Sequence, residues 1–306
     1  MSGVVEAENA TKRYGEVLGL NGFTASFGPG ITALIGPNGA GKSTFFRLLI
    51  GQLRLDSGRL DVLGRAPWDA LELHRQVGYC PEQPSVYDWM TAFEFVAYLL
   101  RLDGIPRAEA DRRATESIGT VGLTSAAHRR LRGFSKGMRQ RVKIAQAIAH
   151  DPKLLLLDEP LNGLDPLGRV EMLELFGRLA ASGRHLIVSS HVLYEVERLT
   201  EEVVIVSNGR AIAQGNLHQL RDAIDAHPHT IVLRTPEPRR LAALLAGREH
   251  VTSVEFRGPE ELAVRTQRPE VFYDQFPALI TDAGIRVSEM SSPDDNLESV
   301  FRFLAE

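Results

Sequence analysis

The stretch Ile35–Leu49, "IGPNGAGKSTFFRLL", places three glycines around one lysine and continues at once into apolar residues at helical spacing. The residues that lead into it, "GITALIG", predict a short buried strand. The pattern G-x-x-x-x-G-K-[ST] is filled by Gly36, Gly41, Lys42 and Ser43. A strand, a glycine-rich loop and a helix in this order are the context that a phosphate-binding loop needs, so the sequence predicts a bound nucleoside triphosphate.

The composition of this loop indicates how it would hold phosphate. Glycines let successive backbone N–H groups point inward as an anion nest, and the helix that follows adds the positive end of its dipole. We expect Lys42 to reach the β- and γ-phosphates and the Ser43 hydroxyl to ligate Mg²⁺. The predicted nucleotide-binding residues of the loop are Gly36, Pro37, Asn38, Gly39, Ala40, Gly41, Lys42, Ser43 and Thr44.

The overall composition sets limits on the class of protein. The 306 residues, 43% hydrophobic and 24% charged, are typical of a soluble globular protein with room for two domains. A net charge of −4 offers no electrostatic basis for binding nucleic acid. Cys80 is the only cysteine, which excludes an internal disulfide and suits a reducing cytosol. There is no apolar signal core and no run near the roughly 20 apolar residues that span a bilayer, so we expect a cytoplasmic protein whose membrane span, if needed, belongs to another chain.

The order of the predicted elements divides the chain into two parts. Residues 1–218 alternate short apolar runs with helical patterns, which predicts a parallel α/β sheet, and a helical stretch at about 91–131 interrupts them. After Leu220 the predicted order is β-α-β-β-α-β, the ferredoxin-like arrangement of a small α+β domain. We therefore expect a nucleotide-binding domain at 1–220, with a helical subdomain at about 90–135, and an accessory or regulatory domain at 221–306.

The last predicted element is a helix in "SPDDNLESVFRFLAE", which ends the chain. Ser292 is a suitable N-cap, and the proline and two aspartates that follow it suit the first turn of a helix. One apolar face would be formed by Leu297, Val300, Phe301 and Leu304. This part of the sequence contains no catalytic constellation.

Two further buried strands are predicted to bring acidic and basic groups to the nucleotide. In "LLLLDEPLNGLD" a strand ends at Asp158 and Glu159, and carboxyl ends of strands form the ligand-binding edge of open α/β sheets. Asp158 would hold Mg²⁺, and Glu159 would polarise the attacking water. The strand in "RHLIVSSH" delivers His191 to the same edge. The predicted catalytic residues are thus Glu159, His191 and Lys42.

The stretch "GFSKGMRQRVKIAQAIAHDP" predicts a second anion site. Ser135 is a plausible N-cap, and an apolar helical face follows it at Met138, Val142, Ala145 and Ala149. The Ser135 hydroxyl and the Gly137 N–H at a helix N-terminus suit a phosphate. A second γ-phosphate site is redundant within one active site, but it makes sense if it serves the nucleotide of a second copy.

These motifs, in this order, resemble the ATP-binding subunit of an ABC transporter over about residues 4–218. The resemblance implies a P-loop NTPase fold and a head-to-tail homodimer with two ATP molecules, each sandwiched between one subunit's phosphate loop and the other's signature helix. Ser135 and Gly137 would then act in trans, and Asp165 in "LNGLD" would cross the dimer interface. Tyr14 in "KRYG" falls where the family stacks an aromatic side chain on adenine.

The sequence departs from the family's pattern at two places. The signature is usually L-S-G-G-Q, and here Phe134, Lys136 and Met138 replace its leucine, first glycine and glutamine. In "GYCPEQPSVYDWM" the family's glutamine position holds Glu82, with Gln83 next to it, so either residue could sense the γ-phosphate. Both departures, together with the C-terminal tail, resemble the ATPases of ABC-2-type exporters.

The function expected from this resemblance is ATP hydrolysis, with Mg²⁺, that drives a separate transmembrane permease for export. The chain would then lie peripherally on the cytoplasmic face of the membrane. The alternative is a soluble, non-transport ABC ATPase acting on ribosomes or DNA. Such proteins usually carry two cassettes or a long coiled-coil insertion, and this chain has neither. A P-loop small-molecule kinase is a weaker alternative, because it needs no signature acting in trans.

A docking surface for the permease is expected at Glu82–Met90, beside the γ-phosphate sensor. The segment is rich in proline, which favours a loop. Its exposed candidates are Val86, Tyr87, Trp89 and Met90, residue types found at interface hot spots or in apolar cores. The alternative is that these side chains pack against the neighbouring helices.

Overall fold

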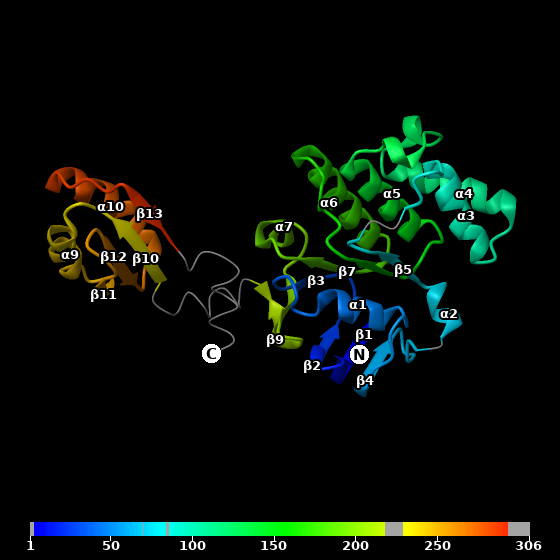
Figure 1. The fold of residues 1–306 in the computed structure, drawn as a ribbon, viewed down its shortest axis with the longest axis horizontal. Coiled ribbons are helices and arrows are strands. Elements are labelled where there is room, and N and C mark those ends of the chain that lie inside the picture. Colours follow the sequence, from blue (N-terminus) through cyan, green and yellow to red (C-terminus); the bar gives the residue numbers. More distant parts are fainter. Residues whose placement is uncertain (1–2, 69, 84–85, 218–228, 293–306) are drawn as a thin grey trace. The chain divides into compact units, whose positions relative to one another are not determined.

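The computed structural model describes residues 3–68, 70–83, 86–217 and 229–292. Contacts divide the chain into two compact units between Gly215 and Asn216 (Figure 1). The boundary predicted at 220/221 lies outside the described residues, so the assignment of two separate domains stays a prediction. No helix in the described ranges is both long and apolar enough to cross a membrane.

The first unit is built around a six-stranded sheet in the order β5-β6-β7-β3-β8-β9. The strands from β5 through β6, β7 and β3 to β8 pair in parallel. Parallel neighbours align the carboxyl ends of β3, β6 and β7 at one edge of the sheet, which is where ligands bind in such folds. The strands are β3 (Ile31–Ile35), β5 (Val77–Cys80), β6 (Leu154–Leu157), β7 (His185–Ser190), β8 (Glu202–Ser207) and β9 (Arg210–Asn216).

A second sheet in this unit corrects the expectation of an exclusively parallel arrangement. Strands β1 (Val5–Tyr14), β2 (Val17–Phe27) and β4 (Ser57–Val62) form an antiparallel sheet in the order β2-β1-β4. A tight turn joins β1 to β2, with Gly15 at φ +60°. From Phe23 to Phe27, alternate residues of β2 are buried while their neighbours are exposed. Burial of every second side chain is the pattern of an antiparallel strand with one buried face. The residues "FTASF" carry this pattern, but no strand was predicted from it.

Two hydrophobic cores cover the two faces of the six-stranded sheet. The run of leucines in β6 divides between them, since Leu154 and Leu156 belong to one core and Leu155 and Leu157 to the other. The first core lies between the two sheets and encloses α1 (Lys42–Leu49), as Figure 1 shows. The second core packs the other face of the sheet under the longer helices. Burial on both faces explains why β6 is apolar at every position.

Three of the helical regions in the first unit were predicted: the one after the phosphate loop, the stretch at about 91–131 and the helix that follows Ser135. The predicted helical stretch at 91–131 contains α3 and α4, and Thr91 caps α3 in a capping box with Glu94. The helices are α2 (Leu71–His74), α3 (Ala92–Leu102), α4 (Arg107–Thr120), α5 (Lys136–Ile148), α6 (Pro166–Ala181) and α7 (Leu193–Glu197), with short 3₁₀ turns at Thr124–Ala126 and Leu131–Gly133. Ser135 caps α5, because its hydroxyl accepts a hydrogen bond from the Met138 N–H at 3.2 Å, as predicted.

The second unit has the predicted β-α-β-β-α-β order. Its elements are β10 (His229–Arg234), α9 (Pro238–Ala246), β11 (Val251–Phe256), β12 (Glu261–Thr266), α10 (Pro269–Ala283) and β13 (Glu289–Ser291). Their sheet order, β11-β12-β10-β13 with each neighbouring pair antiparallel, is that of a ferredoxin-like fold, which confirms the prediction. Alternate residues of β10 and β12 bury their side chains against α9 and α10.

The predicted C-terminal helix lies outside the described residues, which end at Ser292. The Ser292 hydroxyl donates to the carbonyl of Thr230 at 3.3 Å.

Candidate nucleotide-binding and hydrolysis site

The loop between β3 and α1 depends on glycine at its two ends. A Cβ on Gly36 would lie 2.5 Å from the carbonyl oxygen of Val206. A Cβ on Gly41 would lie 2.5 Å from the carbonyl oxygen of Gly19, and Gly41 has a φ of +107°. Only glycine tolerates both the close approach and the left-handed backbone. Among the described residues no side chain caps the start of α1, so its first N–H groups can serve an anionic ligand.

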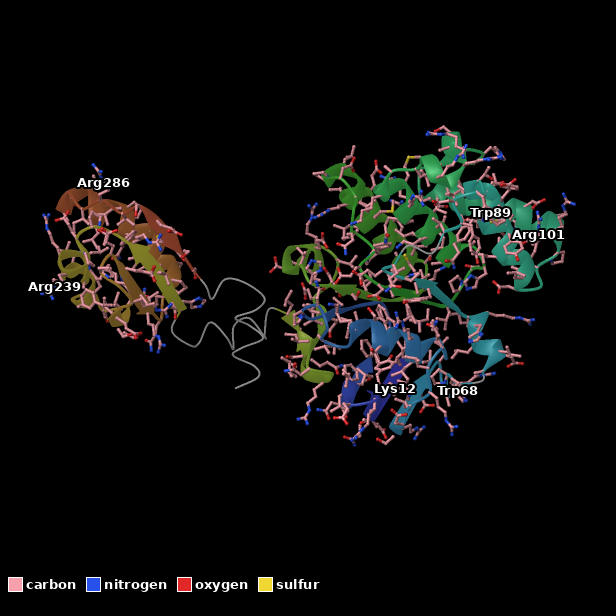
Figure 2. All side chains as sticks on the ribbon, viewed as in Figure 1. Lys12, Trp68, Trp89, Arg101, Arg239 and Arg286 are labelled. Carbon is pink, nitrogen blue, oxygen red and sulfur yellow. The ribbon has the colours of Figure 1, made fainter. Side chains whose placement is uncertain are left out.

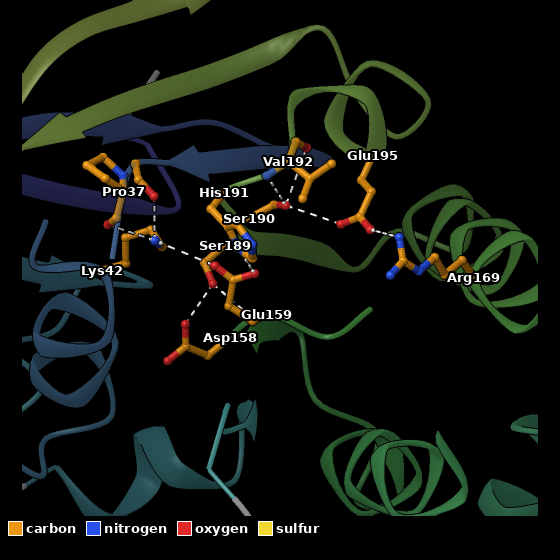
Figure 3. Close-up of polar contacts among 11 residues, drawn as sticks. Pro37, Lys42, Asp158, Glu159, Arg169, Ser189, Ser190, His191, Val192 and Glu195 are labelled. Carbon is orange, nitrogen blue, oxygen red and sulfur yellow. Dashed lines mark hydrogen bonds and ion pairs between the residues drawn. The ribbon is translucent and has the colours of Figure 1, made fainter. Parts of the chain in front are cut away.

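Lys42, the first residue of α1, lies almost entirely buried beneath this loop. Its Nζ donates to the carbonyl oxygens of Gly36 at 2.6 Å and Pro37 at 3.2 Å. The same nitrogen is 3.5 Å from Oε1 of Glu159 (Figure 3). The loop, the cation and the carboxylate predicted from separate motifs are therefore in direct contact.

Ser189 contacts both acidic residues that follow β6, the side chain of Asp158 and the backbone of Glu159. Its hydroxyl donates to Oδ1 of Asp158 at 2.6 Å and accepts from the Glu159 N–H at 2.8 Å. Glu159 has a φ of +47°, which a residue with a side chain rarely adopts. The Ser189 contact helps to hold this unusual backbone conformation. Sequence reasoning overlooked Ser189, although it stands two residues before His191 in "SSH".

The two carboxylate oxygens of Glu159 have different surroundings. Oε2 is 2.9 Å from Nδ1 of His191. Oε1 is buried and has no hydrogen-bond partner in the part of the chain that the structure describes. Burial raises the pKa of the Glu159 carboxyl, and the positive charge of Lys42 and the contact with His191 oppose that rise only in part. A buried oxygen with an unused lone pair is a suitable acceptor for a proton from a reactant.

A second polar network lies next to His191 in the sequence, at the end of β7. The preceding residue, Ser190, donates its hydroxyl proton to Glu195 at 3.2 Å and accepts from the N–H of Val192 at 3.0 Å. Arg169 of α6 donates to the other oxygen of Glu195 at 2.9 Å (Figure 3). This network ties the strand that carries His191 to the helix that follows Asp165. Sequence reasoning did not identify Ser190, Glu195 or Arg169.

Tyr14, the predicted adenine platform, ends β1 and is 42% exposed. A Cβ built on Gly19 would lie 2.7 Å from Cε2 of Tyr14 and 3.0 Å from Cγ2 of Thr44. The tyrosine ring and Thr44, the third residue of α1, therefore both lie against Gly19 of β2. This places an exposed aromatic ring beside the predicted phosphate loop.

Glu82 and Gln83 follow β5, and both side chains are exposed. Their backbone carbonyl oxygens accept hydrogen bonds from the buried Nζ of Lys143 in α5, at 2.9 and 3.4 Å. The geometry does not choose between the two as the predicted γ-phosphate sensor.

Ser135, Gly137 and Asp165 form a separate group. A Cβ on Gly137 would lie 3.1 Å from the carbonyl oxygen of Gly163, so the start of α5 lies against the "LNGLD" loop. The Asp165 carboxylate caps α6 by accepting from the Gly168 N–H at 2.7 Å. Within the described ranges, no hydrogen bond or ion pair joins this group to Lys42 or Glu159. The structure therefore brings the predicted hydrolytic residues Lys42, Glu159 and His191 together, and the predicted second anion site makes no hydrogen bond or ion pair with Lys42 or Glu159 among the described residues.

Part of the predicted docking surface is core. Met90 is 6% exposed, and Val86 packs against the same hydrophobic core as α3. The prediction of Met90 as a surface residue is wrong, because the turn before α3 directs it inward. Tyr87 and Trp89 remain 48% and 69% exposed, with their rings stacked at a centroid distance of 6.0 Å.

Asp158 and Ser43 offer the oxygen ligands that suit Mg²⁺. Asp158 directly follows β6 and is 1% exposed, and Ser43 lies half-buried in the first turn of α1. The described residues contain no group of three or more His, Cys, Asp or Glu side chains that could enclose a metal. Mg²⁺ usually keeps several waters and takes only one or two protein ligands, with phosphates completing its shell. The donor set therefore fits Mg²⁺ bound together with a nucleotide.

Comparison with known proteins agrees with this geometry. The model of the ABC transporter family matches residues 20–162. The ABC transporter ATP-binding protein YxlF of Bacillus subtilis is 34% identical over 88% of both chains. The Nod factor export ATP-binding protein I of Burkholderia orbicola is 30% identical over 93% of this chain and 96% of its own. A solved structure of the ATP-binding subunit of an ABC transporter is 32% identical, with a TM-score of 0.66 over 72% of this chain and 93% of that one.

The chain thus belongs to the ATP-binding proteins of ABC transporters, and its first unit has their P-loop NTPase fold. It is an ATP-binding and ATP-hydrolysing subunit of that class, which confirms the resemblance predicted from the motifs.

Proposed function

We propose that this protein dimerises on ATP and energises a separate transmembrane permease for export. The observation that carries the proposal is the separation of two anion sites in one chain. The phosphate loop contacts Glu159 through Lys42, whereas the N-terminus of α5 lies against the "LNGLD" loop and contacts neither. A site that is unused within one chain is explained when two copies pair head to tail, because each α5 then meets the other copy's nucleotide.

The roles that we propose at the hydrolytic centre follow from charge and hydrogen bonding. Glu159 accepts the proton of the attacking water through Oε1, the oxygen that faces the Lys42 ammonium at 3.5 Å and has no hydrogen-bond partner among the described residues. His191 holds Oε2 and thereby orients the carboxylate. Lys42 neutralises charge that develops on the transferred phosphoryl group.

Metal and nucleotide contacts complete this proposal. Ser43 and Asp158 would hold Mg²⁺, which when bound neutralises phosphate charge and lowers the barrier to phosphoryl transfer. Tyr14 would stack on adenine, with its ring beside Thr44. The γ-phosphate would be sensed by Glu82 or Gln83 from the loop that Lys143 holds. Ser135 and Gly137 would complete the nucleotide-binding site of the opposite copy, and Asp165 would lie at the dimer interface.

The permease is proposed to dock on the surface of Tyr87 and Trp89. Large, stacked and exposed aromatic rings are enriched in protein interfaces and are uncommon on surfaces without a partner. They follow the proposed sensor directly, so closure around ATP would move them. Export is favoured because a relative that matches nearly the whole chain is named for Nod factor export. Docking would place the chain on the cytoplasmic face of the membrane, where the ABC-2-type exporters that it resembles have their ATPases.

The experiment that tests the proposal replaces both aromatic residues with alanine, as Y87A/W89A. We expect wild type to sediment with membranes from its own cells. The variant should stay in the supernatant yet hydrolyse ATP normally when purified. The exposed pair Leu18 and Val17, changed to alanine, is the matched control for loss of apolar surface. If wild type sediments with ribosomes and never with membranes, the alternative of a non-transport ABC ATPase takes the place of this proposal.

A further inference from the structure

Lys143 occupies an unusual position in α5. It is 4% exposed, and its Nζ donates to the backbone carbonyl oxygens of Pro81, Glu82 and Gln83 at 2.7, 2.9 and 3.4 Å. An ammonium group has three N–H donors, so three successive carbonyls use all of them. No carboxylate among the described residues lies within ion-pairing distance, and burial lowers the pKa of the Lys143 amine. A buried lysine held only by backbone carbonyls indicates that this side chain fastens a loop.

Two other side chains of α5 hold the same segment. Arg139, one turn before Lys143, forms an ion pair with Asp88. Gln140 is buried, and its amide donates to the Cys80 sulfur at 3.7 Å. The segment that begins after β5 is therefore attached to α5 at its beginning through Lys143 and at its end through Arg139.

The attached segment lies between two proposed functional features. Its first residues include Glu82 and Gln83, one of which is the proposed γ-phosphate sensor. Its last residues lead to Tyr87 and Trp89, the proposed docking surface. The helix that holds it begins at Ser135, which is eight residues or about 12 Å before Lys143 along the helix axis. A helix of this length is stiff enough to carry a displacement of its N-terminus to the position of Lys143.

We propose that Lys143 is a positioning residue that makes the loop after β5 move with α5. When the N-terminus of α5 binds the nucleotide of a second copy, Lys143 carries that displacement to the sensor and to Tyr87 and Trp89. The partner at this surface would therefore respond to the nucleotide held in trans as well as to the one held by the same chain. The inference rests on the proposed ATP-dependent dimer.

The experiment uses Trp89 as its own reporter. The sequence contains two tryptophans, Trp68 and Trp89, so the variant W68F leaves Trp89 alone to fluoresce. Trp89 lies among the helices of the first unit, and Trp68 lies beside the three-stranded sheet (Figure 2). The parent protein is the full chain with W68F and E159Q, so that ATP binds but is not consumed. Light scattering measures dimerisation, and acrylamide quenching measures the ATP-induced change at Trp89.

Three variants of this parent are compared. K143M keeps the length and apolar stem of the side chain but donates to no carbonyl. K143R keeps the charge and the donors, and K153M removes an exposed lysine as the matched control. We expect K143M to dimerise with ATP while losing most of the change in Trp89 quenching, and K143R and K153M to retain it. A purely structural role would lower the melting temperature of K143M but leave the amplitude of the ATP response intact.

The outcomes separate this inference from the proposed function. If the parent does not dimerise with ATP, the proposed function fails and the inference fails with it. If the parent dimerises and K143M shows the full Trp89 response, only the inference is overturned. If K143M does not fold, D88N decides, because it removes the ion pair with Arg139 at an exposed carboxylate. An unchanged Trp89 response in D88N would then overturn the coupling.

Discussion

Replacing Glu159 with glutamine tests the chemistry of the site most directly. The side chain keeps its length and shape, and a glutamine can still hydrogen-bond to His191 through one of its terminal atoms. The position of Oε1 or Oε2 is then taken by an amide nitrogen, which cannot accept a proton. We expect E159Q to bind Mg·ATP as well as wild type, because the Lys42 ammonium is held mainly by the loop carbonyls at 2.6 and 3.2 Å.

The size of the kinetic effect follows from what surrounds the carboxylate. A general base contributes roughly 10²- to 10⁴-fold to the rate, or about 2.7 to 5.4 kcal/mol of barrier. The other carboxylate at this strand end cannot easily substitute, because Asp158 accepts a 2.6 Å hydrogen bond from Ser189 and is proposed to hold Mg²⁺. Glu159 itself is 5% exposed, so bulk water does not readily replace it. The loss of turnover should therefore be at least about a hundredfold.

The assay separates binding from chemistry. Affinity for Mg·ATP is measured by calorimetry, and phosphate release is measured in a single turnover with enzyme in excess. E174Q is the matched control, because Glu174 is an exposed glutamate of α6 that makes no contact with the site. Turnover of E159Q within a few-fold of wild type would refute the assignment of the base. Loss of ATP binding together with turnover would instead assign Glu159 a part in holding the nucleotide.

Two further predictions concern the dimer and the pH dependence of stability. E159Q with ATP should form a dimer that light scattering detects. Adding S135R should abolish this ATP-dependent dimer, whereas adding S135T, which keeps the helix cap, should not. A dimer that survives S135R contradicts a signature acting in trans. Burial raises the pKa of Glu159 above its ordinary value of 4.5, so the folded state favours the protonated carboxyl. The stability that this group contributes is therefore fully present below pH 4.5 and is lost as the pH rises through the higher pKa of the folded state. E159Q should therefore melt at a higher temperature than wild type at pH 7, with a difference that shrinks toward pH 5, and a less stable E159Q at neutral pH would contradict the dominance of burial.

Local sequence patterns were sufficient for much of the fold. The glycine spacing at Gly36 and Gly41 predicted a loop that the backbone geometry requires to be glycine at both ends. The run of leucines in β6 predicted a buried strand, and the spacing of apolar residues in α5 predicted a helix with one buried face. Both predictions succeed because the spacing of apolar residues within one segment decides which of its faces meet the core. The second unit was predicted for the same reason, since its strands and helices alternate in a recognisable order.

The sequence pattern did not predict the sheet of β1, β2 and β4, and it led to a wrong expectation that Met90 is exposed. Only the second half of β2 alternates buried and exposed positions, and the sheet pairs segments far apart along the chain, since Val5 of β1 pairs with Val62 of β4, 57 residues further on. Met90 belongs to a residue type that occurs both at interfaces and in cores, and only the turn before α3 decides that it faces inward. Composition cannot distinguish the two environments.

The sequence by itself determined which residues we propose for the chemistry, since the lysine, the two carboxylates, the histidine and the capped signature helix each stand in a short motif. The tertiary structure decided which groups position them. Ser189 meets Glu159 across 30 residues, Arg169 meets Glu195 across 26, and Lys143 meets Pro81 across 62. These partners leave no local pattern, because a hydrogen bond between distant segments depends on how the intervening elements pack and not on spacing along the chain.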